Sequence, residues 1–189
     1  MSTRLGRPKQ LLDLAGTPLV RHVAERALAS ALDDVIVVTG AVADDVTAAL
    51  DGLAVEIVYN ADFATGQASS FVTGVRAAEA FAADAIVVLL SDQPTVAIAA
   101  IDAVVARRRA ARAGIVQTGY GATPSHPTLL GSEFFPKLLA VTGDQGAREV
   151  IRAHRDAVAI VPSGEDMPPI DVDTEEAYQA LLEMHRPGS

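Results

Sequence analysis

The sequence has 189 residues, of which 50% are hydrophobic, and this predicts one domain with an ordinary buried core. Its formal net charge of −9 argues against nucleic acid or an anionic membrane as a bulk partner, although a few concentrated cations could still bind a small anion. It contains no cysteine, which excludes disulfides and thiolate metal sites, and no apolar run near the roughly 18 residues that span a bilayer, so we expect a cytoplasmic protein.

Short β-branched runs alternate with longer alanine-rich segments along most of the chain. Some of these runs are almost continuous Val, Ile and Leu, as in strands covered on both faces. The predicted strands are 34–40, 55–60, 85–92 and 113–119. The segments between them repeat apolar residues at helical spacing, and the predicted helices are 18–30, 43–50, 66–82 and 96–112. This alternation predicts an α/β fold with a doubly wound, mostly parallel, Rossmann-like sheet.

The last third is less regular. Glycines and prolines in 119–131 predict a long loop that leads into a short strand, "PTLL", and a short strand is also predicted at 170–173. Helices are expected around 132–140 and 145–155, a strand at 157–162, and a terminal helix whose N-cap is Thr174. The basic run 106–112 lies near the end of a predicted helix, where cations complement the helix dipole, and we interpret it as structural.

The opening stretch, MSTRLGRPKQLLDLAG, combines cations with glycine in an otherwise acidic protein. Gly6 would let the backbone approach a phosphate closely, and Arg4 and Lys9 would supply charge-assisted hydrogen bonds. The alternative is a solvated basic tail. These residues alone do not decide between the two.

Acidic side chains stand at two places where strands are predicted to end. Asp92, in LLSDQPTV, lies where an α/β enzyme exposes a catalytic group, and a carboxylate beside phosphate oxygens suits Mg²⁺. Asp171 and Asp173, in IDVDTEEAY, share one side of the predicted short strand. The alternative for each is capping of the helix that follows.

These motifs resemble, in order, those of the MobA-like nucleotidyltransferases. STRLGRPKQLL followed by GTPLVRH resembles the family's signature loop, with Ser2, Arg4, Gly6 and Lys9 in register. Asp-Gln-Pro after a hydrophobic strand is similar to the motif of molybdenum cofactor cytidylyltransferases and their relatives. Asp173 matches the position that completes the family's metal site, although Glu175 stands where proline is usual.

The resemblance implies nucleotidyl transfer, with CMP from CTP passed to molybdopterin and pyrophosphate released. Asp92 and Asp173 would hold Mg²⁺, with Mn²⁺ as an alternative, while Arg4 and Lys9 hold the β- and γ-phosphates. A molybdoenzyme would be the recipient of the product. Nucleotide contacts would come from the opening loop and from YNADFATGQASSF: Ser2, Arg4, Gly6, Lys9, Asn60, Gly66, Ser69 and Ser70.

Two further motifs resemble the cytidylyltransferase branch. His126, before a proline, would contact a phosphate or pterin group or would brace a turn. Arg148, in TGDQGAREVI, would lie over the substrate, pair with an acid, or stay solvated on a helix. Asparagine and serine in 59–71 equally serve as turn and helix caps. The residues do not specify an oligomeric state.

The family's first strand and first glycines are not in this sequence. Because that strand is normally central, we expect an opening between two buried strands, and we expect a natural form of this single domain, 1–189, to begin roughly ten residues earlier. Two other functions stay open. One is an NAD(P)H-dependent oxidoreductase similar to the family's nicotine blue oxidoreductase, although no complete GxGxxG occurs. The other is a non-catalytic nucleotide-binding accessory protein.

Overall fold

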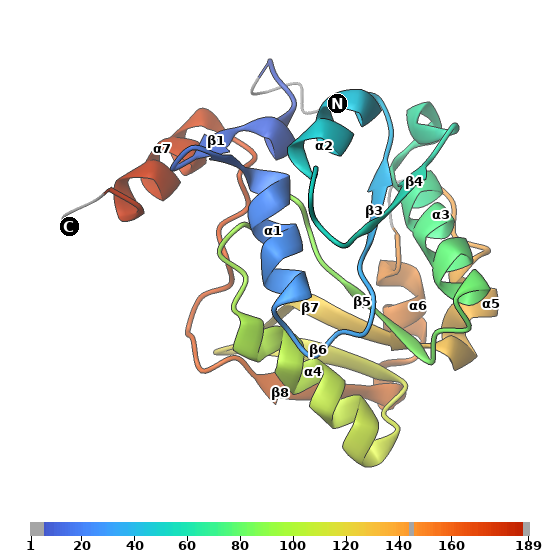
Figure 1. Ribbon diagram of the computed structural model, residues 1–189. Coiled ribbons are helices and arrows are strands. Elements are labelled where there is room, and N and C mark those ends of the chain that lie inside the picture. The colour runs from blue at the N-terminus through green and yellow to red at the C-terminus, as the bar shows by residue number, and fades with distance from the viewer. Residues whose placement is uncertain (1–5, 144–145, 187–189) are drawn as a thin grey trace.

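Strands form the middle of the molecule and helices flank them (Figure 1). The structure is a computed structural model that describes residues 6–143 and 146–186. The first half comprises η1 (Lys9–Leu11), β1 (Asp13–Leu14), β2 (Thr17–Pro18), α1 (Leu19–Leu28), β3 (Ile36–Thr39), α2 (Ala43–Ala49), β4 (Glu56–Tyr59), η2 (Phe63–Thr65), α3 (Gln67–Ala80), β5 (Ala85–Val88) and α4 (Ile98–Ala111). The second half comprises β6 (Ile115–Tyr120), β7 (Thr123–Gly131), η3 (Ser132–Phe134), α5 (Phe135–Leu138), α6 (Arg148–Ala153), η4 (Arg155–Ala157), β8 (Val158–Pro162) and α7 (Glu175–Met184).

The main strands form separate sheets. β3 and β4 are parallel partners, and β5-β7-β6-β8 form a four-stranded sheet. In the larger sheet β7 runs antiparallel to both its neighbours, and β6 and β8 are parallel. The α/β class and the Rossmann-like arrangement are confirmed. The pairing is mixed rather than mostly parallel, because a tight turn joins β6 directly to β7.

That turn corrects the prediction of a long loop at 119–131. Gly121, with a φ of 55°, lets the chain reverse, and β7 then continues for nine residues in spite of its prolines. The register shifts between Gln117 and Thr118, and this bulge leaves His126 and Pro127 without partners across β6. A bulge accommodates proline and re-aims the side chain beside it.

The predicted strand at 170–173 is not observed: this segment has no regular secondary structure and pairs with no strand in the part of the chain that the structure describes. The terminal helix α7 begins where the sequence predicted, since the Thr174 side chain accepts a hydrogen bond from the Ala177 N–H at 3.2 Å. Glu175 and Glu176 in the first turn complement the helix dipole.

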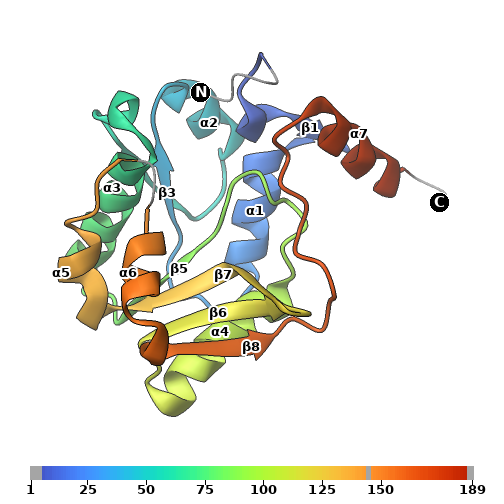
Figure 2. The same ribbon diagram turned by 180° about the vertical axis from the view of Figure 1, so that it is seen from behind.

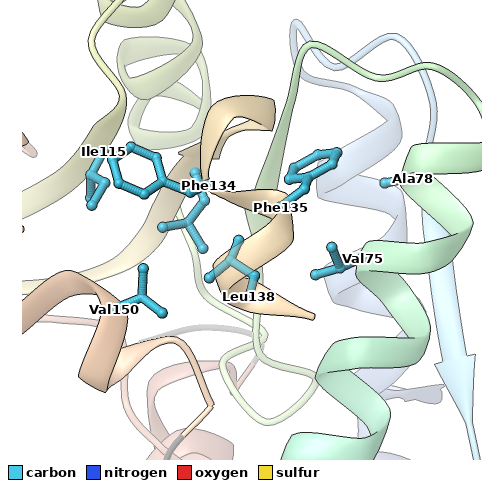
Figure 3. Close-up of a cluster of buried hydrophobic side chains, with 8 residues drawn as sticks. Val75, Ala78, Ile115, Phe134, Phe135, Leu138 and Val150 are labelled. Atoms are coloured by element: carbon cyan, nitrogen blue, oxygen red, sulfur yellow. The ribbon is translucent and has the colours of Figure 1, made fainter. Parts of the chain in front are cut away.

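Helices cover both faces of the larger sheet. On one face, residues from α3, β6, β7, α5 and α6 form the cluster drawn in Figure 3: Val75, Ala78, Ile115, Leu130, Phe134, Phe135, Leu138 and Val150. On the other face, Val104 of α4 packs on Val116 and Leu129. The alternation of Ile115 and Val116 between these clusters is that of a strand covered on both sides.

A third cluster joins the two ends of the described chain. Leu12, Leu14 and Leu19 pack on α7 together with Val172, and both ribbon views show β1 beside α7 (Figures 1 and 2). The Tyr178 hydroxyl donates to the Asp13 carbonyl at 2.6 Å. This packing places the opening segment, and Lys9 with it, next to the residues that precede α7.

An opening lies between β3 and β5, as the sequence predicted. The two strands share no hydrogen-bonded pairing, and a cavity of about 650 Å³ extends along both of them. Elsewhere, no helix of the described residues has the length and apolar character needed to cross a membrane.

Candidate functional site

Lys9 joins the two predicted metal carboxylates. Its ammonium nitrogen donates to Asp92 Oδ2 and, at 2.7 Å, to Asp173 Oδ1. Asp92 is buried, with 7% of its surface exposed, whereas the Asp173 side chain is 56% exposed. The site therefore has a buried carboxylate and a solvent-facing carboxylate on either side of one cation.

Backbone contacts hold both carboxylates in place. Asp92 lies in the turn that follows β5, where the Gln93 N–H donates to the Leu90 carbonyl at 3.1 Å. The Val172 N–H then donates to the Asp92 carbonyl, also at 3.1 Å. Since Val172 is buried among the leucines of the opening segment, Asp173 is held beside Asp92 by packing as well as by charge.

Gln93 and Asp171 make a second link between the same two segments. The Gln93 amide, 3% exposed, donates from Nε2 to Asp171 Oδ1 at 2.7 Å. The sequence analysis singled out the Asp-Gln-Pro motif, which contains Gln93, and Asp171, but it did not predict a hydrogen bond between these two residues. Asp171 therefore braces the turn and makes no hydrogen bond with Lys9, whose carboxylate partners are Asp92 and Asp173.

The environment of Lys9 favours its charged form. Burial by itself would lower the lysine pKa, but the hydrogen bonds and charges of Asp173 and Asp92 outweigh burial, so the pKa of Lys9 is raised. The two carboxylates that bond to Lys9 carry more negative charge than its single ammonium balances. Such a site attracts a further cation.

The residues fit a divalent cation that takes oxygen ligands. Asp92 and Asp173 already converge on one cationic atom, the Lys9 nitrogen. The described residues contain no group of three or more His, Cys, Asp and Glu side chains able to hold a metal. Two carboxylates, with water and phosphate oxygens completing the shell, is the pattern typical of Mg²⁺ in nucleotide sites.

The predicted nucleotide-binding loop is held by internal hydrogen bonds. The buried Asn60 donates from Nδ2 to Ser69 Oγ at 2.8 Å and to Ser70 Oγ at 3.0 Å, and its Oδ1 accepts from the Asp62 N–H. Gly66 adopts a φ of 124° at the start of α3, where a side chain would be strained. Ser70 lines the same cavity as Lys9 and Asp92, so this loop borders the carboxylate site.

His126 lies behind the carboxylates. Its Nδ1 is 3.2 Å from the Val88 carbonyl, so Nδ1 carries the proton in that hydrogen bond. Burial lowers the pKa of His126 despite this bond, and the ring is neutral near pH 7. The contact braces β7 against β5, which is the turn-bracing interpretation of this residue.

Of the remaining predicted residues, two lie outside the described residues, and Arg148 and Gly6 make no hydrogen bond with Asp92 or Asp173. Arg148 is exposed at the start of α6, where it borders a shallow hollow with Arg152, Arg155 and Ile160. Gly6, with a φ of 61°, has open space around it. Ser2 and Arg4 lie outside the described residues.

The basic run is structural. Arg108 is 7% exposed and donates to Asp84 (Nε to Oδ2, 2.9 Å) and to Glu133 (Nη1 to Oε1, 2.8 Å). These bonds tie the end of α4 to β5 and to the turn after β7. The Asp84 pKa is lowered mainly by the Arg108 hydrogen bond. Burial by itself would raise the Glu133 pKa, but the Arg108 hydrogen bond, a backbone hydrogen bond and the Arg108 charge together outweigh burial and lower it.

Comparison with known proteins identifies the family. The model of the MobA-like NTP transferase domain matches residues 1–158. The chain belongs to this family of nucleotidyltransferases. It is 32% identical over 188 residues to the nicotine blue oxidoreductase of Paenarthrobacter nicotinovorans, and 32% identical over 195 residues to the purine catabolism protein PucB of Bacillus subtilis (strain 168). Each match covers 95% of this chain and 90% of the relative.

Solved structures have the same fold. A homologue of Mycobacterium tuberculosis Rv0371c, from Mycobacterium sp. strain JC1, is 30% identical, with a TM-score of 0.84 over 97% of this chain and 90% of its own. Rv0371c from M. tuberculosis H37Rv, in a crystal structure of its complex with manganese, is 29% identical, with a TM-score of 0.80 over 95% and 94% of the two chains.

Proposed function

We propose that this protein transfers a nucleoside monophosphate, CMP from CTP, to a phosphorylated pterin-type cofactor such as molybdopterin, and releases pyrophosphate. The observation that carries the proposal is the convergence of Asp92 and Asp173 on one cation at the end of β5. Ligands of open α/β sheets bind at the carboxyl ends of the strands.

Asp92 and Asp173 would hold a divalent cation, Mg²⁺ or Mn²⁺. A bound metal would supply positive charge that offsets the charge of the phosphates. The manganese complex of the 29% identical Rv0371c supports this assignment. The buried Asp92 carboxylate would fix the position of the cation, and the exposed Asp173 would leave its outer side open to water and substrate.

Lys9, with Arg4, would bind the β- and γ-phosphates. The lysine ammonium sits on a flexible stem, so it can exchange carboxylate partners for phosphate partners when a nucleotide arrives. Its raised pKa keeps it charged for this task. The loop of Asn60, Gly66, Ser69 and Ser70 would contact the nucleotide, with Ser2 and Gly6, while His126 and Arg148 would face the acceptor.

The reaction needs no general base among these residues. A phosphate oxygen of the acceptor attacks the α-phosphorus, the bond from that phosphorus to the bridging oxygen breaks, and pyrophosphate leaves with the bonding electrons. A phosphate monoester is largely ionised at pH 7, because its second pKa is about 6. The side chains therefore act by positioning and by charge.

Pyrophosphate release tests the proposal. The full chain would be incubated with CTP, GTP or ATP, with Mg²⁺ or Mn²⁺, and with or without a pterin monophosphate. We expect release that depends on acceptor and metal, and that is fastest with CTP. Equal rates with the three nucleotides would contradict the choice of CTP. NADPH oxidation without pyrophosphate would favour the oxidoreductase, and nucleotide binding without turnover would favour the accessory protein.

A further inference from the structure

The turn after β5 is a firm support for the Gln93 side chain. The Gln93 N–H donates to the Leu90 carbonyl at 3.1 Å, and the Gln93 carbonyl accepts from the Val96 N–H at 3.2 Å. Gln93 is only 3% exposed, and the ring of Pro94 restrains the backbone that follows it. The Gln93 amide is therefore held at a fixed place in the turn that carries Asp92.

The segment 170–173 crosses this turn at one buried residue. Val172 is fully buried, and its N–H donates to the Asp92 carbonyl at 3.1 Å. The Asp173 N–H donates to the Asp171 carbonyl at 2.9 Å, and a hydrogen bond between residues two apart closes a three-residue turn, here centred on Val172. The two aspartates therefore flank the residue at which the segments cross.

The two aspartates have different partners. The Asp171 carboxylate accepts from the neutral Gln93 amide at 2.7 Å. The Asp173 carboxylate accepts from the Lys9 ammonium, also at 2.7 Å. Both aspartates are exposed, and their side chains are chemically identical. Neither burial nor charge therefore decides which of them meets the ammonium, so the anchoring of the segment has to decide it.

The sequence of this segment permits two registers. Residues 170–173 read Ile-Asp-Val-Asp, which repeats an apolar residue followed by an aspartate. A slip of two residues would put Ile170 in the buried position of Val172. The same slip would bring Asp171 to the place of Asp173. The alternation of apolar and acidic residues therefore fits both registers equally well.

The residue ahead of the buried position differs between the two registers. In the observed register it is Asp171, whose carboxylate accepts from the Gln93 amide. In the slipped register it would be Pro169, whose side chain has no hydrogen-bond acceptor. The slipped register would take this acceptor away from Gln93, and a buried donor without a partner is costly.

We propose that Gln93 is a positioning residue: its amide holds Asp171, and this fixes the register in which Asp173 is presented to the Lys9 ammonium and to a metal that replaces it. The inference rests on the proposed function, in which Asp92 and Asp173 hold a divalent cation. A neutral donor suits this task, because it adds no positive charge that would repel the metal.

Loss of either partner should disturb the site in the full chain. Gln93→Leu removes the donor, and Asp171→Leu removes the acceptor from the exposed side of the same bond. In both variants we expect Mn²⁺ to bind about tenfold more weakly by calorimetry, and the Val172 amide to exchange its hydrogen at least about tenfold faster. Unchanged Mn²⁺ affinity together with unchanged exchange would overturn the proposal.

Asp171→Asn separates the hydrogen bond from the charge. The new side chain keeps an oxygen that accepts from Gln93 but has no negative charge. We expect Mn²⁺ affinity within about threefold of wild type, since the charge of an exposed group counts for little, and unchanged exchange at Val172. A loss as large as that in Asp171→Leu would mean that Asp171 acts on the metal by its charge, and would overturn the proposal.

The double variant Gln93→Leu/Asp171→Leu tests whether the two residues act through one bond. If they do, the double variant should lose about as much Mn²⁺ affinity as either single variant, about tenfold. A loss of about 100-fold, the product of two independent effects, would contradict this. Gln179→Leu is the matched control, because Gln179 donates to the Glu175 carboxylate at 2.8 Å on the exposed side of α7. It should change neither quantity.

The two measurements distinguish this inference from the proposed function. Hydrogen exchange is measured on the metal-free chain, so it reports the register whether or not a metal binds. If the wild type binds no Mn²⁺ but Gln93→Leu loses protection at Val172, the metal site fails and the positioning by Gln93 stands. If the wild type binds Mn²⁺ and every variant binds it equally, the metal site stands and the positioning is refuted.

Discussion

Asp92 and Asp173 accept hydrogen bonds from the same nitrogen, the ammonium of Lys9, although the three residues come from the start, middle and end of the chain. The arrangement has two physical consequences. Each carboxylate is held by the Lys9 cation, so a divalent metal that bound the two carboxylates would have to displace it. The same ammonium also holds η1 of the opening segment against the turn after β5.

Loss of the buried carboxylate should stop the reaction without unfolding the protein. In Asp92→Asn the side chain keeps its shape but loses its charge, and we expect turnover to fall by at least about 100-fold, measured as pyrophosphate release. Tm should change by only a few degrees, because Lys9 keeps Asp173 as a partner. Asp156→Asn, at an exposed site, is the control. Wild-type rates in Asp92→Asn would remove Asp92 from the metal site.

Removal of the competing cation should strengthen metal binding. In Lys9→Met the two carboxylates lose their ammonium partner, and we expect Mn²⁺ to bind about tenfold more tightly, about 1.4 kcal/mol, by calorimetry. Pyrophosphate release should nevertheless fall, because the lysine would no longer bind phosphates. Lys137→Met, the same change at an exposed lysine on α5, should alter neither quantity. Weaker Mn²⁺ binding in Lys9→Met would contradict this prediction.

The Arg108 contacts should make stability depend on acid pH. Asp84 and Glu133 have lowered pKa values in the folded state, so their contribution is present above their unfolded pKa values, about 4, and is lost as the pH falls through the lowered values. Arg108→Met should cost about 2 kcal/mol at pH 7, after discounting for the exposure of both carboxylates.

The test for Arg108 is a urea titration at several pH values. The gap between wild type and Arg108→Met should narrow as the pH is lowered from 6 toward 3, on the order of the carboxylate pKa values. Arg107→Met, at the exposed neighbouring position, should leave the free energy of unfolding unchanged. A gap that is constant with pH would mean that packing of the arginine stem, rather than charge, accounts for the loss.

The Asn60 amide should be a structural requirement of the predicted nucleotide-binding loop. Asn60→Ala would leave the Asp62 N–H and the hydroxyls of Ser69 and Ser70 without this partner, and we expect a loss of about 2 kcal/mol in the free energy of unfolding. The KM for the nucleotide should rise at the same time. A higher KM with unchanged stability would instead indicate that Asn60 contacts the nucleotide directly.

The spacing of apolar residues along the chain was sufficient to predict most of the helices and strands. The apolar spacing of 18–30, 66–82 and 96–112 agrees with α1, α3 and α4 to within two residues at each end. The prediction that Thr174 is the N-cap of the terminal helix was also correct, because N-capping depends on residues that are close together in the sequence. The errors were at 119–131, at 170–173 and at the end of 85–92, because β5 ends at Val88. In 119–131 a bulge in the β6–β7 pairing decides the conformation. In 170–173 the hydrogen bond from the Val172 N–H to the distant Asp92 carbonyl does so. Neither feature has a signal in the neighbouring sequence.

By itself, the sequence determined the α/β class and the family, and it predicted Asp92 and Asp173 as the metal carboxylates, since spacing and motif order are properties of the chain alone. Only the tertiary structure decided that Lys9 lies between Asp92 and Asp173, that Gln93 holds Asp171, and that His126 braces β5. These contacts exist because Leu12 and Leu14 pack on α7 and a bulge turns β7. Packing between distant segments depends on shape and volume, which a linear pattern of residue types does not contain.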